Sequence, residues 1–375
     1  MSCDGGGLDV NNAKTLDVED LLHVSVLYAD DVDQDELVQV GQPIPKETLK
    51  MNGDEMKRWF GHTKFGCMGS PLVTHFEPAV TCEHHCAYCY VNGYPCRGRR
   101  KPSQAMSSDR FCVVHVARLK ARKMLALYGR MANGSARSGL WDGMTPEMHM
   151  SISTDCLQPD VEVQEKSLLV MRVWLDEGLL LSIVSKGIPL TDNLRTRMLE
   201  LFREHKDRVS FQVTCASVDQ AAQKLWEPGA PPPHERLHWL ADIVATGIAR
   251  PSLRMNPLVP GINDSEAQLA ETVRGAAKTG VKRIAVSYMY ASRAILYEMS
   301  ANGVDVFNAF DKEQSKIRGG APKLHVSKEK RFAAHLIVTK AAAAAGIAVT
   351  SCGCDNTDIY PLNEQKCGIC WRSST

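Results

Sequence analysis

Residues 81–90 read TCEHHCAYCY, and in this stretch Cys82, Cys86 and Cys89 are spaced C-x3-C-x2-C. Cysteine thiolates bind iron–sulfur clusters, and a cluster of four irons normally takes four of them. Three thiolates would leave one iron open for a substrate or cofactor, which is how catalytic metal sites differ from closed structural ones. The spacing therefore predicts a catalytic [4Fe-4S] cluster and, with it, an enzyme.

Zinc is the alternative metal for this motif. A structural zinc takes four ligands in a tetrahedral arrangement, and the fourth would come from His84, His85 or Cys96. The C-x3-C-x2-C spacing favours the cluster over zinc, so we expect iron.

The bulk composition indicates a globular protein that stays out of membranes. The chain has 375 residues, of which 44% are hydrophobic, enough for one large core or two domains. It contains no apolar run of about 18 residues, the length that spans a bilayer, and the start MSCDGGGLDVNN lacks the basic and apolar parts of a secretory signal. We therefore expect a cytoplasmic protein, in which the 13 cysteines serve metal binding rather than disulfides.

The net charge of +1 hides a separation of charges along the chain. Residues 1–40 contain ten acids and one lysine, whereas residues 97–130 contain ten lysines and arginines and one acid, Asp109. A basic stretch that begins just after the cysteine motif indicates an anionic substrate such as a nucleic acid, a nucleotide or another phosphate compound. The alternative is a solvated helix face that pairs with the acidic N-terminus.

Apolar runs of strand length alternate with segments of helix length from residue 71 onward. Such alternation predicts a parallel sheet, and right-handed crossovers would curl it into a partial or full TIM-type (βα) barrel of about six parallel strands. The carboxyl ends of the strands carry the chemistry in this α/β architecture, and the cysteine motif follows the first strand. The expected strands are 72–76, 149–153, 179–184, 209–213, 252–255 and 283–288, and the expected helices are 109–128, 164–177, 192–204, 234–246 and 265–278.

We divide the chain into three parts. Residues 1–70 would form an acidic lead-in or cap, residues 71–290 the barrel, and residues 291–375 a C-terminal extension. Within the extension we expect a looser segment up to residue 324, a helix from about Lys328 to Ala345, and one more strand over 347–350 that enters the same sheet.

Four cysteines in the extension, spaced C-x-C-x12-C-x2-C, predict a second metal site. It would hold either an auxiliary [4Fe-4S] cluster or a structural zinc, and the spacing does not decide between them. The strand that precedes this group would end on the same edge of the sheet as the first motif, which favours the auxiliary cluster. The four residues are Cys352, Cys354, Cys367 and Cys370.

The first motif resembles the signature of the radical S-adenosylmethionine (SAM) superfamily, and further short runs resemble the branch of spore photoproduct lyase. The resemblance covers roughly residues 75–290, and the runs occur in the same order as in that branch. Besides C-x-Y-C-Y at 86–90, they are Ser153-Thr154-Asp155 with Gln158-Pro159, Ser185-Lys186, Trp226-Glu227-Pro228 with Arg236-Leu237, and Arg254-Met255-Asn256-Pro257 with Pro260-Gly261.

This resemblance implies an enzyme that cleaves SAM with an electron from an external flavodoxin- or ferredoxin-type donor. Cys82, Cys86 and Cys89 would hold the cluster, and Lys186 would pair with the SAM carboxylate. The other residues that it places around SAM are Tyr88 and Tyr90 for packing, Ser153 or Thr154 and Thr214 or Ser217 for hydrogen bonds, and Arg254 facing the same pocket.

Two charged residues of these motifs have structural roles in our interpretation. Asp155 would either orient a ligand or cap the helix that follows it, and we favour the cap. We expect Glu227 to cap a helix or to pair with Arg236. Neither residue is assigned to the chemistry.

One departure from the lyase concerns its hydrogen donor. The lyase uses a cysteine three residues before the aspartate to return a hydrogen atom to its product, and here that position is Ile152. Cys156 and Cys215 stand at expected strand ends and are our candidates for that role. The resemblance thus implies the radical machinery rather than the lyase reaction.

We therefore expect a radical SAM enzyme that modifies a nucleic acid, a nucleotide or another phosphate-bearing substrate. A tailoring enzyme for natural products or peptides is the second interpretation, because auxiliary clusters are common there. A third, from another class, is a nucleic-acid-binding protein held together by metal and without catalysis. Iron content and SAM cleavage distinguish the two enzymes from the third interpretation.

Overall fold

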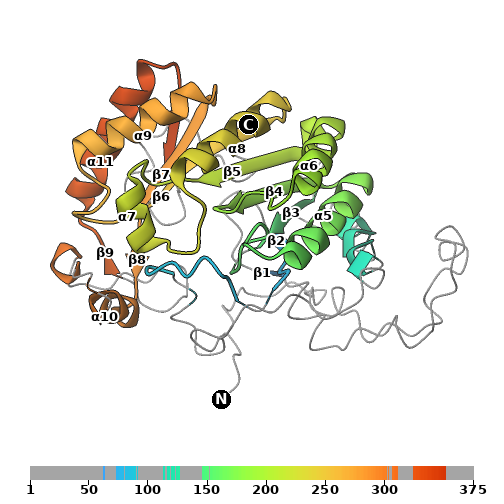
Figure 1. Ribbon diagram of the computed structural model, residues 1–375, viewed down its shortest axis with the longest axis horizontal. Helices are drawn as coiled ribbons and strands as arrows, with labels where there is room; N and C mark the ends of the chain where they lie inside the picture. Colours follow the sequence, from blue (N-terminus) through green and yellow to red (C-terminus); the bar gives the residue numbers. More distant parts are fainter. Residues whose placement is uncertain are drawn as a thin grey trace, which may run out of the picture.

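The computed structural model describes residues 62–63, 73–79, 81–89, 91, 113–126 apart from 115, 119 and 123, 146–151, 153–301, 303, 306–310 and 324–351. The other segments are drawn as a thin grey trace in Figure 1. Our predictions for the acidic lead-in, for most of the basic stretch, for Tyr90 and for Cys352, Cys354, Cys367 and Cys370 lie outside the described residues.

An eight-stranded sheet forms the centre of the described structure, in the order β1-β2-β3-β4-β5-β6-β7-β10 (Figure 1). β1 (His62–Thr63) is antiparallel to β2, and the seven other strands are parallel to one another. Among the described residues the two edge strands have one partner each, so the sheet is an open, partial barrel. The bounds are β2 (Val73–Phe76), β3 (Glu147–Met150), β4 (Leu180–Ser185), β5 (Val209–Thr214), β6 (Arg250–Leu258), β7 (Arg283–Tyr288) and β10 (Ala348–Ser351).

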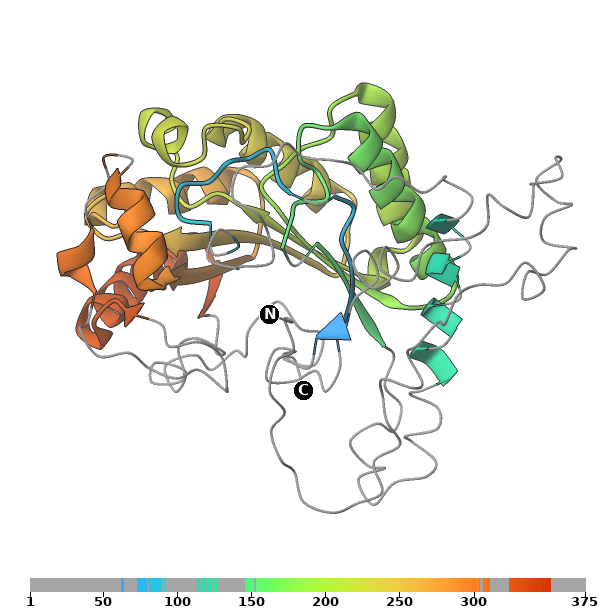
Figure 2. The same cartoon turned by 90° about the horizontal axis from the view of Figure 1, so that it is seen from below.

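Helices connect the strands and lie along the outer side of the curved sheet, as Figure 2 shows. Side-chain caps begin five of the six helices bounded below, because a hydroxyl or carboxylate satisfies amides that lack a helical partner. The caps are Asp160 before α5, Thr191 before α6, Asp219 before α7, Ser265 before α9 and Ser327 before α11. No helix in the described ranges combines the length and apolar character needed to cross a membrane. The bounds are α5 (Val161–Asp176), α6 (Asp192–Glu204), α7 (Gln220–Trp226), α8 (Pro233–Ala245), α9 (Glu266–Lys278) and α11 (Lys328–Ala343).

The sheet has an apolar outer face and a polar inner face, because successive side chains on a strand point to opposite sides. Phe211 of β5 packs edge-on against Phe202 of α6 and Trp239 of α8, which identifies the outer face. The inner face carries polar side chains on adjacent strands, in the register His149–Ser182–Ser210, Gln212–Ser252 and Thr214–Arg254.

The predicted fold class is confirmed, and one strand begins and ends earlier than expected. β3 ends at Met150 rather than 153, because Ser151 has a left-handed backbone conformation (φ 55°) and the next amides turn to a buried carboxylate. β10 pairs in parallel with β7, as predicted. The looser segment between them contains β8 (Tyr290–Ala291), α10 (Arg293–Ala301) and β9 (Leu324–His325), in which β8 and β9 are antiparallel.

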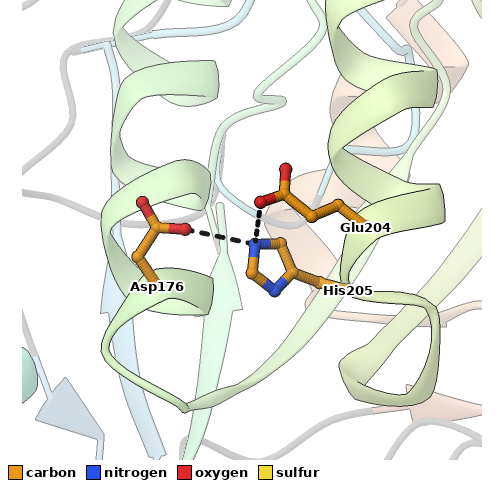
Figure 3. A group of neighbouring side chains, drawn as sticks. All are labelled: Asp176, Glu204 and His205. Atoms are coloured by element: carbon orange, nitrogen blue, oxygen red, sulfur yellow. Dashed lines mark hydrogen bonds and ion pairs between the residues drawn. The ribbon is translucent and has the colours of Figure 1, made fainter.

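A charged group ties the end of α5 to the end of α6 (Figure 3). His205 Nε2 lies 3.1 Å from Asp176 Oδ1 and 3.7 Å from Glu204 Oε1. These side chains have the chemistry of metal ligands, but two cations already serve them: Arg172 bonds to Glu204, and Arg208 Nη2 lies 2.7 Å from His205 Nδ1. Burial and Arg208 lower the pKa of His205, so we interpret the group as a structural tie.

Candidate active site

Residues 81–89, which we call the cluster loop, follow β2 and place Cys82, Cys86 and Cys89 on one cavity of about 330 Å³. The cavity opens at the carboxyl ends of the parallel strands, where this architecture carries its active sites. It is also lined by His84, Tyr88, Val91, His149, Met150, Ser151, Ser153, Thr154, Asp155, Ser182, Val184, Ser185, Lys186, Thr214, Arg254, Asn256, Pro257, Tyr288, Met289 and Tyr290.

The cluster loop is held on one side by a glutamine. The backbone amide of Glu83 donates to Gln158 Oε1 at 2.8 Å, and Gln158 Nε2 donates to the carbonyl of Thr81 at 3.2 Å. Gln158 is fully buried. One side chain therefore fixes two backbone groups at the start of the loop.

On the other side, the loop packs against the turn between α7 and α8. The amide of Ala87 donates to the carbonyl of Trp226 at 2.9 Å, and the amide of Gly229 donates to the carbonyl of His84 at 3.1 Å. A Cβ on Gly229 would lie 2.0 Å from the carbonyl oxygen of Glu83. Only glycine permits this approach of two backbones.

Asp155 is buried at the centre of the site and joins three segments. Its Oδ1 accepts from Ser185 Oγ at 2.6 Å and from the amide of Leu157 at 2.9 Å, and its Oδ2 accepts from the amide of Lys186 at 2.7 Å. His84 Nε2 lies 3.1 Å from the same Oδ2. Burial alone would raise the pKa of Asp155, but His84 and these hydrogen bonds outweigh it and lower the pKa.

The expectation that Asp155 caps the following helix is wrong. The cap of α5 is Asp160, which accepts from the amides of Glu162 and Val163. The carboxylate of Asp155 is already used by β4 and by its own turn. Its role is to position the loop after β3 against the end of β4.

A buried carboxylate that the sequence analysis missed, Glu77, holds Ser153 and Thr154. Its two oxygens accept from the amides of both residues, at 2.8 and 3.0 Å, and from Thr154 Oγ1 at 2.6 Å. Both residues line the cavity, as the SAM assignment requires. Since the hydroxyl proton of Thr154 is directed to Glu77, this hydroxyl faces the cavity as an acceptor.

Tyr88 and Lys186 lie together beside a buried ion pair. The Tyr88 hydroxyl donates to Glu227, and Glu227 Oε2 lies 2.5 Å from Arg236 Nη1, which confirms the predicted pair. Lys186 Nζ lies 5.4 Å from the centre of the Tyr88 ring, within the range of cation–π attraction. Burial would lower the pKa of Lys186, but Cys86 and Glu227 raise it, so its ammonium is charged.

The predicted hydrogen-bonding residues divide into two groups. Thr214 and Arg254 line the cavity, and Arg254 Nη1 donates to Gln212 Oε1 at 3.1 Å. Ser217 lies outside the lining, and its hydroxyl accepts from the amide of Asp219 at 3.1 Å.

The two candidate hydrogen donors are fully buried and do not line the cavity. Burial raises the pKa of the Cys215 thiol to about 11, and its Sγ donates to the carbonyl of Ser217 at 3.3 Å. Burial also raises the pKa of the Cys156 thiol. Both are therefore neutral thiols behind the cavity wall.

The three loop cysteines fit an iron–sulfur cluster better than zinc. All three are free thiols on one cavity, and burial raises the pKa of Cys86 to about 12, so a metal is needed to hold it as a thiolate. Two of the proposed fourth zinc ligands are engaged elsewhere: His84 contacts the carbonyl of Gly229 and Asp155, and His85 pairs with Glu83 at 2.9 Å. The third, Cys96, lies outside the described residues.

Comparison with curated proteins finds one distant relative, and no family model matches the chain. The uncharacterized protein ORF301 of Acidianus two-tailed virus is 26% identical over 173 residues, which are 45% of this chain and 51% of that protein. The chain therefore spans about half the length of the curated relative that it matches.

Solved structures of spore photoproduct lyase share the fold. The lyase complexed with dinucleoside spore photoproduct has a TM-score of 0.54 at 13% identity, over 74% of this chain and 76% of that chain. A cysteine-to-alanine mutant with the same dinucleoside has a TM-score of 0.55 at 12% identity, over 84% and 93%. A double mutant with bound SAM and dinucleoside has a TM-score of 0.52 at 12% identity, over 71% and 72%. The chain thus has the partial-barrel fold of spore photoproduct lyase, as the resemblance implied.

Proposed function

We propose that this protein is a radical SAM enzyme. The observation that carries the proposal is the convergence of Cys82, Cys86 and Cys89 with Lys186 on one cavity of this fold. A [4Fe-4S] cluster bound there would supply the electron that splits SAM into methionine and a 5′-deoxyadenosyl radical, which then abstracts a hydrogen atom from an unactivated carbon.

The residues of the chain would bind and orient SAM. Lys186, charged and stacked on Tyr88, would attract the carboxylate. Thr154, whose hydroxyl proton is held by Glu77, would accept a hydrogen bond from a donor of SAM, while Thr214 and Ser153 line the neighbouring wall. The cluster loop would deliver the three thiolates from a backbone already held on both sides, by Gln158 and by the turn between α7 and α8.

For the second substrate we propose a nucleic acid, a nucleotide or another phosphate-bearing compound. The proposal rests on the basic stretch at 97–130 and on the dinucleoside bound by the lyase of the same fold. A flavodoxin- or ferredoxin-type protein would supply the electron. The hydrogen donor would be Cys156 or Cys215, each of which would reach the substrate through movement of the wall.

A second metal site in the C-terminal extension is also part of the proposal. β10 ends at Ser351, one residue before Cys352 in the sequence. Because β10 is parallel to β2, it ends at the carboxyl end of the sheet, as β2 does where it leads into the cluster loop, although five strands lie between them. We propose that Cys352, Cys354, Cys367 and Cys370 hold an auxiliary [4Fe-4S] cluster there, with zinc as the alternative.

The decisive experiment is anaerobic reconstitution with iron and sulfide, followed by reduction with dithionite in the presence of SAM. The parent protein is expected to be brown and to release 5′-deoxyadenosine. The variant with Cys82, Cys86 and Cys89 all replaced by alanine is expected to release none, because no thiolate remains to hold the cluster.

His85→Asn is the matched control. His85 is exposed on the same loop, pairs with Glu83, and has a left-handed backbone conformation that asparagine tolerates. We expect its yield of 5′-deoxyadenosine to stay within about twofold of the parent. A triple-alanine variant that cleaves SAM like the parent would refute the proposal.

A further inference from the structure

The cavity carries two cations that point toward its opposite ends. Lys186 Nζ reaches the Tyr88 ring in the cluster loop. Arg254 Nη1 instead donates to Gln212 Oε1. Thr214 of β5 is paired with Arg254 of the neighbouring strand β6, and Gln212 precedes Thr214 by two residues on β5. The guanidinium therefore leans toward the amino-terminal half of the sheet, away from the loop.

The spacing of the strands separates these two cations. Ser185 faces Val213, so Lys186 follows β4 at the level at which Thr214 and Arg254 face each other. Because neighbouring strands are about 4.8 Å apart and β5 lies between β4 and β6, the two backbones are about 10 Å apart. With their charged ends directed apart, Lys186 and Arg254 mark two separate positions for anions.

The charge of Lys186 is balanced within the protein, and that of Arg254 is not. Lys186 has the buried carboxylate of Glu227 as its neighbour of opposite charge, and Cys86 becomes a second one when a metal holds it as a thiolate. Arg254 instead bonds to the neutral amide of Gln212, and no carboxylate of the described residues pairs with it. A half-buried guanidinium on a cavity wall without a counter-ion is a binding group for an oxyanion, whose geometry its planar donors match.

The inner face beneath Arg254 is polar where a barrel is normally filled with branched apolar side chains. Gln212 and Ser252 face each other there and are each 1% exposed. Within the described ranges, Gln212 Nε2 and Ser252 Oγ have no hydrogen-bond partner, although burying a polar group without such a partner is unfavourable. Neither residue lines the cavity, so Gln212 acts on a ligand through Arg254.

We propose that Arg254, positioned by Gln212, binds an oxyanion of the second substrate, a phosphate or a carboxylate group, at the end of the cavity remote from the cluster loop. Lys186 serves the carboxylate of SAM at the other end. The division of the cavity between two substrates rests on the proposed function, and the anion site itself rests on the geometry of Arg254.

The test is calorimetric titration of the reconstituted protein, saturated with S-adenosylhomocysteine, with inorganic phosphate and, in a parallel arm, with acetate. Phosphate binding identifies a phosphate-bearing substrate, and a preference for acetate identifies a carboxylate-bearing one. Arg254→Gln should lower the affinity for the preferred anion at least tenfold. Gln212→Glu should do the same although Arg254 is retained, because the new carboxylate neutralises the guanidinium.

Ser210→Ala is the matched control, since Ser210 lies on β5 two residues before Gln212, is equally buried and lies outside the cavity lining. Its anion affinity should equal that of the parent. Thermal unfolding of each variant checks that the fold is retained, and Gln212→Glu should not unfold earlier than Arg254→Gln because it adds an ion pair.

Three results would overturn this inference. The first is a parent protein that binds neither anion, and the second is an unchanged anion affinity in Arg254→Gln. The third is a loss of anion affinity in Lys186→Gln, measured without S-adenosylhomocysteine, that equals the loss in Arg254→Gln. The last would place the anion at the SAM end. Release of 5′-deoxyadenosine from SAM is measured on the same protein preparations without S-adenosylhomocysteine. A parent that binds the anion through Arg254 but cleaves no SAM would refute the proposed function and leave the anion site standing.

Discussion

Asp155 shows how one buried carboxylate can organise a site without taking part in its chemistry. It links the turn after β3 to the end of β4 and to the cluster loop, through Leu157, Ser185, Lys186 and His84. Asp155 accepts a hydrogen bond from the backbone amide of Lys186. It therefore also fixes the backbone from which the ammonium group that we propose for SAM binding extends.

The lowered pKa of Asp155 gives a pH dependence with a definite sign. The folded protein favours the carboxylate more than the unfolded chain does, where an aspartate titrates at about 3.9. Its stabilising contribution is therefore complete above that value and is lost as the pH falls through the lowered pKa of the folded state. Asp155→Asn should lower the free energy of unfolding by roughly 2 kcal/mol at neutral pH, since hydrogen bonds to charged groups contribute about 1.5–3 kcal/mol.

Urea unfolding of the metal-free protein between about pH 7 and pH 3 measures this effect. The difference between parent and Asp155→Asn should shrink toward the acid end. Asp160→Asn is the control, because asparagine caps a helix nearly as well as aspartate. A constant difference across the whole pH range would contradict the prediction.

Individual residues were predictable where a short motif contains them. The three cysteines, predicted from their spacing, and Lys186, implied by the family resemblance, line one cavity. Glu77 and Gly229 were missed because their partners lie far along the chain: Glu77 holds Thr154, 77 residues away, and Gly229 contacts His84, 145 residues away. A lone acid after a strand and a glycine in a turn carry no periodic signal that would identify such contacts.

At the scale of elements, the turn between α7 and α8 acts as a clamp on the cluster loop. Gly229 is the point of closest approach, where an added Cβ would lie 2.0 Å from a backbone oxygen. We expect Gly229→Ala to lower the free energy of unfolding by about 1–3 kcal/mol, the usual effect of overpacking. It should also lower the iron content after reconstitution, because the loop that carries the cysteines must shift.

Gly275→Ala in α9 is the control for that substitution. Its Cβ would meet side-chain atoms of Leu237 and Val218, at 3.0 and 3.2 Å, rather than backbone, and alanine favours a helix over glycine. Iron analysis and thermal unfolding compare the two variants. An iron content in Gly229→Ala equal to that of the Gly275→Ala control would show that the clamp does not position the loop.

The strands and helices were largely predictable because burial imposes a period on them. β5, with Phe211 toward the helices and Gln212 toward the interior, shows the alternation that a parallel strand requires. The end of β3 was not predictable, because it depends on the left-handed Ser151 and on the distant Glu77. Sequence pattern thus identifies an element more reliably than its ends.

At the scale of the whole molecule, the C-terminal extension contributes a strand to the central sheet. β10 belongs to the extension in sequence but lies beside β7 in the sheet. Metal analysis of the variant that lacks Cys82, Cys86 and Cys89 tests the second site. We expect about four irons per chain from an auxiliary cluster, whereas a zinc site would give about one zinc and almost no iron.

The same samples give a second readout. Loss of Cys367 and Cys370 in addition should remove that metal and destabilise the fold, because metal binding contributes to folding free energy. A triple variant that contains neither metal would show that the C-terminal cysteines are free thiols.

The hydrogen bonds of the cluster loop also determine how the protein behaves when it has not yet bound metal or has lost it. Gln158, Trp226 and Gly229 hold its backbone through hydrogen bonds that involve no thiol. The loop is therefore preorganised, unlike a zinc finger, which is unfolded without its ion. Oxidative damage to a cluster there would bleach the protein without unfolding it, and the same polypeptide could be reloaded rather than replaced.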